Sequence, residues 1–560
     1  MKFGKLLLGS TFAATLALAP AAAHAAANIF IVNADGPNEG FNDPTPAAPV
    51  GGNPGTTLGQ QRLNAFQFAA DIWGSILESD APIYILSSFD PLPCSATGGT
   101  LGAAGALEVW SSTPGAEIPG VWYHVALANK LAGEDLSPNP DGEDIIAFFN
   151  TDLDNPVCLG SRGWYYGVDN NHGTNVDLVT VLLHEFGHGL GFANFASEVS
   201  GTLLAGRPDI FTYYTLDTKT GKYWDEMTNA ERVASAINSG KVVWDGINVT
   251  SAVPSVLAPG TPLLKVNQPS SLGVMQIGAA AFGPALTSTG VTGDVVLGTD
   301  AANAAGPSTT DGCSPITSPV AGKIALVDRG TCGFTVKVKN AQDAGAIAVL
   351  VADNAPGSPP AGLGGADPTV TIPSVRITLP DGNAIKAALG SGTVNVTFGL
   401  DLSVRAGANP SGKALLYAPN PVASGSSISH FDVSATPNLL MEPAINADLP
   451  HGIDLTLQQM TDIGWFSDAD GVPDGLDSCI GSDAGDTIVI DSCDSGVTNT
   501  TFANGCRISD LIADCAEGAG NHGAYVSCVS HLTNSLKKNG TITGADKGAI
   551  QSCASGASIP

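Results

Sequence analysis

The chain has 560 residues and carries 23 Lys and Arg against 52 Asp and Glu, a formal net charge of −29. This length allows roughly three or four domains. The strong negative charge argues against nucleic acid and anionic membrane surfaces as partners, because both repel an acidic protein. With 68 glycines and 37 prolines, the composition favours turns and β-structure over a helical bundle.

The N-terminus has the pattern of a secretory signal peptide. Lys2 and Lys5 precede an apolar run over residues 6–18, and residues 23–25 (Ala-His-Ala) form a small-residue cleavage site. The run is too short for a membrane anchor, and no later run of about eighteen apolar residues follows, so we expect no membrane span in the mature chain. The mature protein is expected to begin near Ala26 and to lie outside the cytoplasm, secreted to the medium or in the periplasm.

Ten cysteines in an exported chain indicate five disulfides. If each of the first two cysteine-bearing regions closes on itself, Cys94 pairs with Cys158 and Cys313 with Cys332. No CxxC pair is present, which argues against a zinc finger. The remaining six allow many connectivities, among which the sequence does not choose: Cys479, Cys493, Cys506, Cys515, Cys528 and Cys553.

An α+β arrangement is predicted for the first part of the chain. Residues 62–77 place apolar side chains at helical spacing, and residues 175–183 are long and apolar enough for a buried helix. Thr174 and Asp177 have capping-box spacing at the start of this second helix. The predicted strands lie at residues 28–33, 82–88, 121–127 and 145–150.

The second helix continues into residues 184–188, His-Glu-Phe-Gly-His. His184 and His188 lie one turn apart on one face, so two imidazoles can bind one metal ion. Glu185 is placed beside them to accept a proton from metal-bound water rather than to act as a ligand. These residues match the zinc-peptidase motif HExxH, and the alternative is a chance occurrence of the same spacing.

A catalytic zinc site normally takes three protein ligands. In the metzincin zinc peptidases the motif extends to a third histidine, in the pattern HExxHxxGxxH. Gly191 is present here, and it would let the chain turn sharply after the helix. The third ligand position, however, is Asn194, and an amide is a poor zinc ligand. Either the site is defective or the third ligand comes from elsewhere in the chain.

Residues 283–400 change to a Gly/Ala/Val-rich alternation, and residues 322–351 predict a strand, a turn, a helix and a strand. This run closely resembles the protease-associated (PA) domain that is inserted in many secreted peptidases. The resemblance implies a domain that gates access or binds protein and does no chemistry, with Cys313 and Cys332 as its disulfide. Arg329 is assigned a structural role in a turn.

Beyond this region, three sequence elements resemble the leishmanolysin-type branch of the metzincins. They are a Ser-His-aromatic segment at residues 429–431, a Met-Xaa-Pro turn at residues 441–443, and a segment ending in Asp-Xaa-Gly-aromatic at residues 462–465. The resemblance implies that His430 is the third zinc ligand and that Met441 packs beneath the metal without binding it.

Other third ligands remain open. His451 and His172 are rival histidines, but neither lies in the sequence context of the family motif. An acidic third ligand such as Glu198 would make the protein a gluzincin-type peptidase, and the Met-Xaa-Pro turn at Met441 argues against this alternative.

The C-terminal residues have a different composition. Residues 467–479 hold closely spaced aspartates in a Gly-containing loop and resemble one calcium-binding repeat of the thrombospondin type. Such carboxylates suit Ca²⁺, with an acidic solvated linker as the alternative. The segment from Cys506 to Cys553 predicts three short helices stapled by cysteines. The candidate calcium ligands are Asp468, Asp470, Asp474 and Asp477.

Together these features predict an α+β fold with a metzincin-like catalytic domain in two halves, an inserted α/β PA domain and a small cysteine-rich helical module. The expected boundaries are 1–25 for the signal peptide, 26–282 for the upper catalytic half and connecting region, 283–400 for the PA domain, 401–466 for the lower half, 467–500 for the acidic linker and 501–560 for the helical module.

The predicted function is hydrolysis of protein or peptide substrates by a secreted zinc endopeptidase, with Glu185 as general base and the three histidines as ligands of Zn²⁺. By family analogy, the strand at residues 145–150 is expected to form the sheet edge that binds substrate. The alternative is a secreted binding protein or adhesin with a decayed metal site, which Asn194 would favour.

Overall fold

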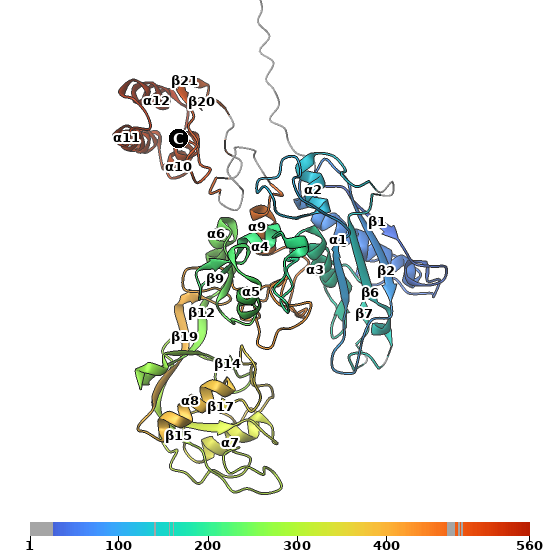
Figure 1. Cartoon of the computed structure of the whole chain (residues 1–560), viewed down its shortest axis with the longest axis vertical. Helices are drawn as coiled ribbons and strands as arrows, with labels where there is room; N and C mark the ends of the chain where they lie inside the picture. Colours follow the sequence, from blue (N-terminus) through green and yellow to red (C-terminus); the bar gives the residue numbers. More distant parts are fainter. Residues whose placement is uncertain are drawn as a thin grey trace, which may run out of the picture.

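The computed structural model describes residues 26–138, 142–155, 157–160, 162–466, 477–479, 482 and 485–559. Figure 1 shows an N-terminal sheet with its helices at the right, a protruding β-rich region at the bottom and a small C-terminal module at the upper left. One hydrophobic cluster joins buried side chains of residues 27–257 with those of residues 408–465, while the protruding region and the C-terminal module have clusters of their own. Two distant segments of the chain therefore share one core, and the residues between them fold separately.

A four-stranded sheet in the order β1–β2–β6–β3 forms the N-terminal part, with β1, β2 and β6 parallel and β3 antiparallel to β6. Helix α1 packs against α3, and the Trp73 indole N–H donates to the Leu183 carbonyl at 3.1 Å. The elements are β1 (Ile29–Asn33), η1 (Gly40–Asn42), α1 (Leu58–Ile76), β2 (Ile83–Asp90), β3 (Gly102–Ala106), β4 (Val109–Trp110), β5 (Tyr123–His124), α2 (Val125–Ala132), β6 (Ile145–Asn150), η2 (Thr151–Asp154), β7 (Trp164–Tyr165), β8 (Val176–Asp177) and α3 (Leu178–Leu190).

Two predictions for this region are wrong. Residues 121–127 do not form a strand. Only β5 is extended, and α2 begins directly after it, with its first five residues all buried. The strand at residues 145–150 exists as β6, but it lies between β2 and β3 and is not a sheet edge. The two edge strands are β1 and β3, and the edge next to β6 is β3, whose run Gly-Ala-Ala-Gly-Ala lacks the branched and aromatic residues that favour strands.

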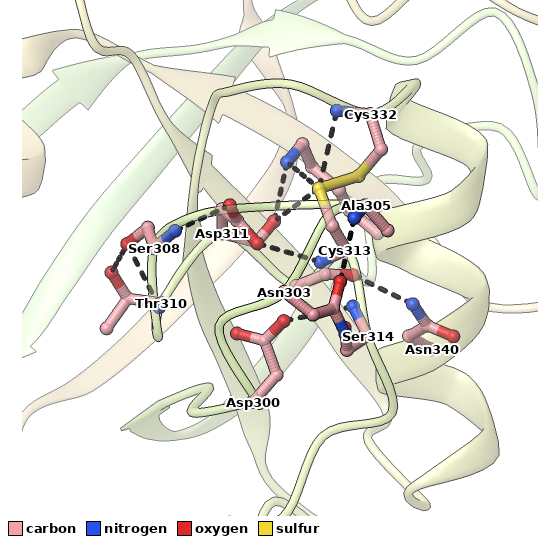
Figure 2. The surroundings of a disulfide bond; sticks show 12 residues. Asp300, Asn303, Ala305, Ser308, Thr310, Asp311, Cys313, Ser314, Cys332 and Asn340 are labelled. Atoms are coloured by element: carbon pink, nitrogen blue, oxygen red, sulfur yellow. Dashed lines mark hydrogen bonds between the residues drawn. A yellow bond between two sulfur atoms is a disulfide. The ribbon is translucent and has the colours of Figure 1, made fainter.

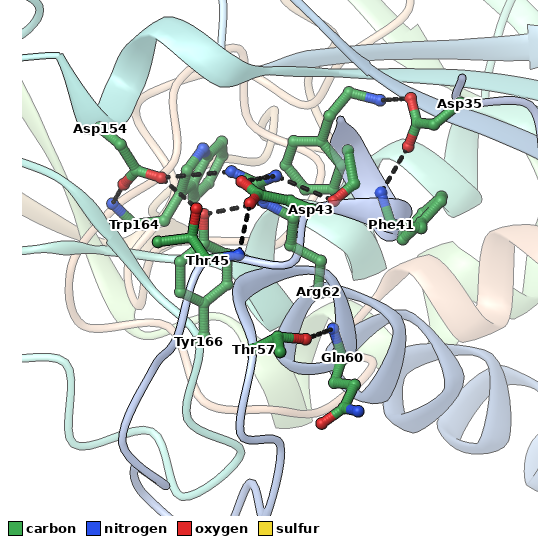
Figure 3. A network of polar contacts seen from close by, with 12 residues as sticks. Asp35, Phe41, Asp43, Thr45, Thr57, Gln60, Arg62, Asp154, Trp164 and Tyr166 are labelled. Carbon is green, nitrogen blue, oxygen red and sulfur yellow. Dashed lines mark hydrogen bonds and ion pairs between the residues drawn. The ribbon is translucent and has the colours of Figure 1, made fainter. Parts of the chain in front are cut away.

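A buried arginine on α1 joins the loops at the start of the chain to those that follow β6 (Figure 3). Arg62 is 4% exposed, and its guanidinium donates to the Gly40 carbonyl at 3.0 Å and to the Tyr166 hydroxyl at 3.2 Å. It also forms ion pairs of 3.5 Å with Asp43 and Asp154. The positive charge of Arg62 is therefore neutralised by one carboxylate from each of the two loop regions.

Arg62→Met is expected to lower the free energy of unfolding by roughly 3 kcal/mol, because it leaves two carboxylates and a buried carbonyl without their donor. Urea denaturation followed by tryptophan fluorescence measures this change. Arg207→Met, at an exposed arginine that lies over the Trp122 ring, should cost less than about 1 kcal/mol. Equal costs for the two variants would contradict a structural role for the network.

After α3 a connecting region leads to a short three-stranded sheet, and residues 406–466 return to pack on it. Asp462 at the end of α9 accepts hydrogen bonds from the Trp244 indole N–H at 2.7 Å and the Asn248 backbone N–H at 2.9 Å. Trp465 then donates to the Leu190 carbonyl at 3.1 Å, so the last helical turn lies against the end of α3. The elements are η3 (Leu204–Gly206), α4 (Ile210–Tyr214), β9 (Thr215–Asp217), β10 (Lys222–Tyr223), η4 (Trp224–Glu226), α5 (Asn229–Ser235), β11 (Val242–Trp244), α6 (Ile247–Val256) and α9 (Thr456–Asp462).

The protruding region is an eight-stranded sheet in the order β13–β12–β19–β15–β16–β17–β18–β14. Long antiparallel strands β12 and β19 lead out to it and back (Figure 1). The sheet therefore begins at Pro259, before residue 283. Its elements are β12 (Pro259–Gln268), η5 (Ser270–Leu272), β13 (Val274–Gln276), β14 (Gly278–Ala279), β15 (Val291–Leu297), β16 (Ile324–Asp328), α7 (Phe334–Asp343), β17 (Ala348–Ala352), β18 (Ser374–Ile377), α8 (Leu379–Leu389) and β19 (Asn395–Arg405).

The strand, turn, helix and strand predicted over residues 322–351 are confirmed as β16, α7 and β17. Alternate residues of β16 belong to different cores: Ile324 packs with the α8 side and Ala325 with the α7 side. This two-sided burial explains why the strand reads as a continuous apolar run. Arg329 pairs with Asp353 at 3.0 Å, which agrees with the structural role assigned to it.

The C-terminal module is a β-hairpin with three helices, stapled by three disulfides. Of the disulfides predicted earlier in the chain, Cys94–Cys158 and Cys313–Cys332 are both confirmed. In the described part of the chain, no helix combines the length and apolar character needed to cross a bilayer. The module consists of β20 (Thr487–Ile490), β21 (Cys493–Thr498), α10 (Ile508–Glu517), α11 (His522–Lys538) and α12 (Gly544–Gly556), with disulfides Cys479–Cys506, Cys493–Cys553 and Cys515–Cys528.

Candidate metal centre

The candidate site is built on helix α3, which is buried along its whole length. Asp177 caps the helix, and its Oδ1 accepts the Thr180 backbone N–H at 2.9 Å. The predicted capping box with Thr174 is therefore wrong. The helix begins later than expected, at Leu178, because residues up to Asp177 pair as a short strand with β7.

Gly191 ends the helix with φ 142° and ψ 0°, a conformation that side chains disfavour. A Cβ at this position would also lie 2.4 Å from the Ile463 side chain. The sharp turn expected after the helix is found here. It brings the carbonyl of Phe192 back over the last turn, where His188 Nδ1 donates to it at 2.7 Å.

Three histidine side chains converge beside α3. His184 Nε2 and His188 Nε2 lie 3.1 Å apart, and His430 Nε2 lies 3.2 Å from the second and 3.3 Å from the first. All three side chains are buried, and together they form a group that could hold a metal ion. Tetrahedral zinc with Zn–N bonds of about 2.0–2.1 Å would place its nitrogens roughly 3.3 Å apart, so the spacing fits zinc.

The other nitrogen of each ring is fixed by a backbone carbonyl. Nδ1 of His184 donates to Leu440 at 2.7 Å, and Nδ1 of His430 donates to Ser426 at 2.8 Å, as His188 does to Phe192. This places the proton on Nδ1 and leaves three Nε2 lone pairs facing one another. Converging lone pairs repel unless a cation lies between them, which is the condition that a metal ion satisfies.

Burial also keeps the rings uncharged. It lowers the pKa of His184 to about 4 and that of His430 to about 3, because a buried imidazolium loses its hydration. The pKa of His188 lies well below its ordinary value for the same reason, with the two neighbouring histidines lowering it further. Neutral imidazoles are the form that binds metals.

The rival third ligands have other partners. His172 contacts the carbonyls of Asn175 and Ala447, and His451 Nε2 lies 2.9 Å from the Asp177 carboxylate. Glu198 accepts a hydrogen bond from the Asn194 amide at 3.3 Å. Among the described residues, none of the three belongs to the group that could hold a metal ion.

Asn194, at the usual metzincin ligand position, contacts the segment that carries His430. Its side-chain amide donates to Ser429 Oγ at 2.8 Å, and its backbone N–H donates to the same oxygen at 3.1 Å. Ser429 directly precedes His430, so Asn194 holds the loop that carries His430.

Met441, the predicted residue of the Met-turn, is fully buried. A Cβ on Gly187 would lie 2.9 Å from its sulfur, so the methionine packs directly on α3. Its carbonyl accepts the Phe431 N–H at 2.8 Å. The turn thereby supports both the helix and the segment that follows His430.

Glu185 points toward the edge strand β3. A Cβ on Gly102 would lie 3.1 Å from its side chain, and the Ala104 backbone N–H is a hydrogen-bond donor to its carboxylate. Burial raises the pKa of Glu185 to about 8, which that hydrogen bond partly opposes. A dication held by the nearby histidines would lower this pKa and favour the carboxylate that acts as a base.

A cavity of about 360 Å³ adjoins the start of α3. Thr180 and Asp177 line it from the helix, Leu101 from beside β3, and residues 445–449 from the segment after Met441. Arg162 is the cation of its lining. The cavity thus lies between the helix that bears the histidines and the loop that follows the methionine turn.

The candidate calcium ligands Asp468, Asp470 and Asp474 lie outside the described residues. Asp477 is described and buried, and its carboxylate accepts the Cys479 backbone N–H at 2.7 Å. This contact gives Asp477 a role in the loop closed by the Cys479–Cys506 disulfide.

Sequence reasoning missed β3 and the carbonyls that orient the histidines. The strand run Gly102–Ala106 carries no strand signal, and its place at the edge depends on the strand order. Backbone carbonyls such as those of Leu440 and Ser426 leave no trace in residue type. The one signal for this segment is Gly102, where the absence of a Cβ permits the close approach of Glu185 and Phe149.

Residues 291–385 match the PA domain family. Among curated proteins, the chain is 38% identical over 111 residues to a probable lipoprotein aminopeptidase of Mycobacterium tuberculosis, which covers 19% of this chain and 21% of that protein. It is 37% identical over 82 residues to the minor extracellular protease Vpr of Bacillus subtilis, which covers 15% of this chain and 10% of that protein. It is 38% identical over 90 residues to leucine aminopeptidase 2 of Trichophyton equinum, which covers 16% of this chain and 18% of that protein.

The aligned parts thus span about a fifth or less of these relatives. Among solved structures, a zinc aminopeptidase from Bacillus subtilis is 24% identical with a TM-score of 0.19, covering 27% of this chain and 35% of that one. The comparisons establish a PA-domain-containing chain whose curated relatives are peptidases.

Proposed function

We propose that this chain is a secreted zinc endopeptidase of the metzincin type, resembling leishmanolysin, with His184, His188 and His430 as the metal ligands. The observation that carries the proposal is the convergence of three neutral imidazoles, each with its Nδ1 on a backbone carbonyl, beside a buried glutamate. A secreted binding protein whose metal site had decayed would not require three Nε2 lone pairs directed at one point.

Zinc held by the three histidines would supply Lewis-acid activation of water and of the scissile carbonyl. Glu185 accepts the proton of the attacking water and delivers it to the leaving amine. Its burial keeps water away from the carboxylate apart from the reacting molecule, and Ala104 N–H orients it.

Substrate is proposed to bind as an additional strand along β3. The Leu101 carbonyl accepts the Asn150 N–H, and the Leu107 N–H donates to the Asp144 carbonyl. The backbone polar groups of these two odd-numbered residues, which flank β3, therefore face β6. Backbone polar groups alternate along an antiparallel strand, and those of the even-numbered residues Gly102, Ala104 and Ala106 therefore face the free edge. Of these groups, the Ala104 N–H is already bound to the Glu185 carboxylate. A peptide paired there passes Glu185 with its backbone held in extended form.

The cavity beside α3 is the proposed pocket for a substrate side chain. It lies between Thr180, one turn before His184, and Leu101, next to the edge strand. Arg162 and Asp177 both line it, so its lining offers a cation and a carboxylate to a polar substrate side chain.

An aminopeptidase is the second candidate, favoured by the names of the curated relatives. The two candidates differ in what they need from the substrate. Pairing along β3 uses the peptide backbone and needs no free amino terminus, whereas an aminopeptidase recognises that terminus.

The test is hydrolysis of an internally quenched peptide with an acetylated N-terminus, compared with leucine p-nitroanilide, by the zinc-loaded full chain. We expect cleavage of the blocked peptide, loss of cleavage with a chelator and recovery with Zn²⁺. Cleavage of leucine p-nitroanilide alone would support the aminopeptidase, and zinc binding without cleavage of any protein substrate would support the decayed site.

Asn194→Ala is expected to weaken zinc binding by about tenfold, because it releases the loop that presents His430. Competition with a fluorescent zinc chelator measures the affinity. Asn171→Ala, at an exposed asparagine, is the matched control and should leave the affinity unchanged. An unaltered affinity in Asn194→Ala would show that the contact with Ser429 does not position the ligand.

A further inference from the structure

The disulfide of the PA region joins two cysteines in different surroundings. Cys313 lies in the long segment between β15 and β16 and is 6% exposed, whereas Cys332 lies just before α7 and is partly exposed. Figure 2 shows the bond enclosed on the Cys313 side by the polar residues of that segment, including Asp311 and Ser314. Cys332 is therefore the more exposed half of the bond and the side from which we expect a thiol in solution to approach.

Two hydrogen-bond donors point at the sulfur of Cys313. Lys337 Nζ lies 3.3 Å from it. The backbone N–H of Cys332 also donates to it, at 3.3 Å (Figure 2). No donor among the described residues is recorded on the sulfur of Cys332. The two sulfurs of one disulfide thus differ in how well each would carry a negative charge.

Lys337 is fully buried on α7, an uncommon place for a lysine. Its ammonium also donates to the Asp311 carbonyl at 2.5 Å. Burial lowers the pKa of this lysine, while the carboxylates of Asp311, Asp300 and Asp328 oppose that effect and favour the cation. A packing role alone would not require the charge to lie against a sulfur atom.

We propose that Cys313–Cys332 is a site of thiol exchange, in which a low-molecular-weight thiol forms a mixed disulfide with Cys332 and Cys313 leaves as a thiolate beside Lys337. The incoming thiolate donates its electron pair to the Cys332 sulfur, and the electrons of the old S–S bond remain on Cys313. One disulfide is exchanged for another, so no oxidant is needed.

The ammonium and the N–H accelerate this step because a stabilised thiolate is a better leaving group. In the reverse step the Cys313 thiolate attacks the Cys332 sulfur, restores the original bond and releases the small thiol. While modified, the segment between β15 and β16 loses its covalent link to the start of α7 and keeps only hydrogen bonds to that helix. The proposal does not depend on the metal centre or on peptidase activity.

The first test maps the adduct on the unmodified full chain. The protein is incubated with reduced glutathione, quenched with acid, alkylated with N-ethylmaleimide and digested for mass spectrometry. We expect glutathione on Cys332 and N-ethylmaleimide on Cys313. Glutathione on Cys313, equal labelling of both cysteines, or no adduct on this pair would overturn the proposal.

The second test compares two variants of the same helix. Lys337→Met should slow adduct formation by about tenfold, because it removes the charge next to the leaving sulfur. Lys339→Met is the matched control, since Lys339 lies on α7 but pairs with Asp343, and its rate should equal that of the unmodified chain. Equal rates for both variants would contradict the role of Lys337, and the mapping result stands even if Lys337→Met fails to fold.

Discussion

Glu185→Gln is expected to reduce peptide hydrolysis by about 10³-fold while zinc stays bound. The substitution keeps the shape of the side chain and its contact with the Ala104 N–H, but an amide cannot accept the proton of the attacking water. None of the three imidazole nitrogens is altered, so the metal affinity should not change. Initial rates on the blocked quenched peptide, with zinc content measured on the same sample, test both halves of the prediction.

The control for this variant is Glu198→Gln. Glu198 is a half-buried glutamate after the same helix, and burial raises its pKa as well, but it bonds Asn194 and does not belong to the histidine group. It should retain most of the activity. If Glu185→Gln kept more than about a tenth of the rate, another group would have to be the base.

His430→Ala is expected to abolish stoichiometric zinc binding and hydrolysis together. The two histidines of α3 would remain, but a structural or catalytic zinc site needs at least three protein ligands. The loss should therefore exceed the roughly 10–100-fold cost of removing a residue that only supports a ligand. Zinc content after dialysis against a weak chelator gives the measurement.

His451→Ala and His172→Ala are the matched controls, since both histidines were rivals for the same role. The first contacts Asp177 and the second two backbone carbonyls, and both should keep one zinc per chain. Full zinc content and activity in His430→Ala would mean that the leishmanolysin-type assignment is wrong. Loss of zinc in His451→Ala instead would transfer the role to that residue.

The local features of the chain were predictable because they depend on neighbours in the sequence. The spacing of His184 and His188 places both on one face of any helix, and the apolar run before them requires burial. The strand, helix and strand of the PA region were recognisable for the same reason. Thr174 shows the limit of such reasoning, since β7 pairs with β8 and moves the helix start to Leu178.

The position of His430 could be inferred only through a family resemblance, and its contacts not at all. It meets His188 across 242 residues of sequence, and a carbonyl of Ser426 orients its ring. No periodicity or residue type records such a contact, because it arises when β12 and β19 carry the chain out and back.

By itself, then, the sequence determined the pair of histidines with its glutamate and the strand–helix–strand pattern of the PA region, since each rests on short-range spacing. The first two disulfides followed only on the condition that each cysteine-bearing region closes on itself. Only the tertiary structure decided that β3 and not β6 is the free edge beside Glu185, and that Asn194 holds the loop bearing His430. The physical reason is that strand order and loop contacts follow from packing across one shared core, whose two parts lie far apart in the chain.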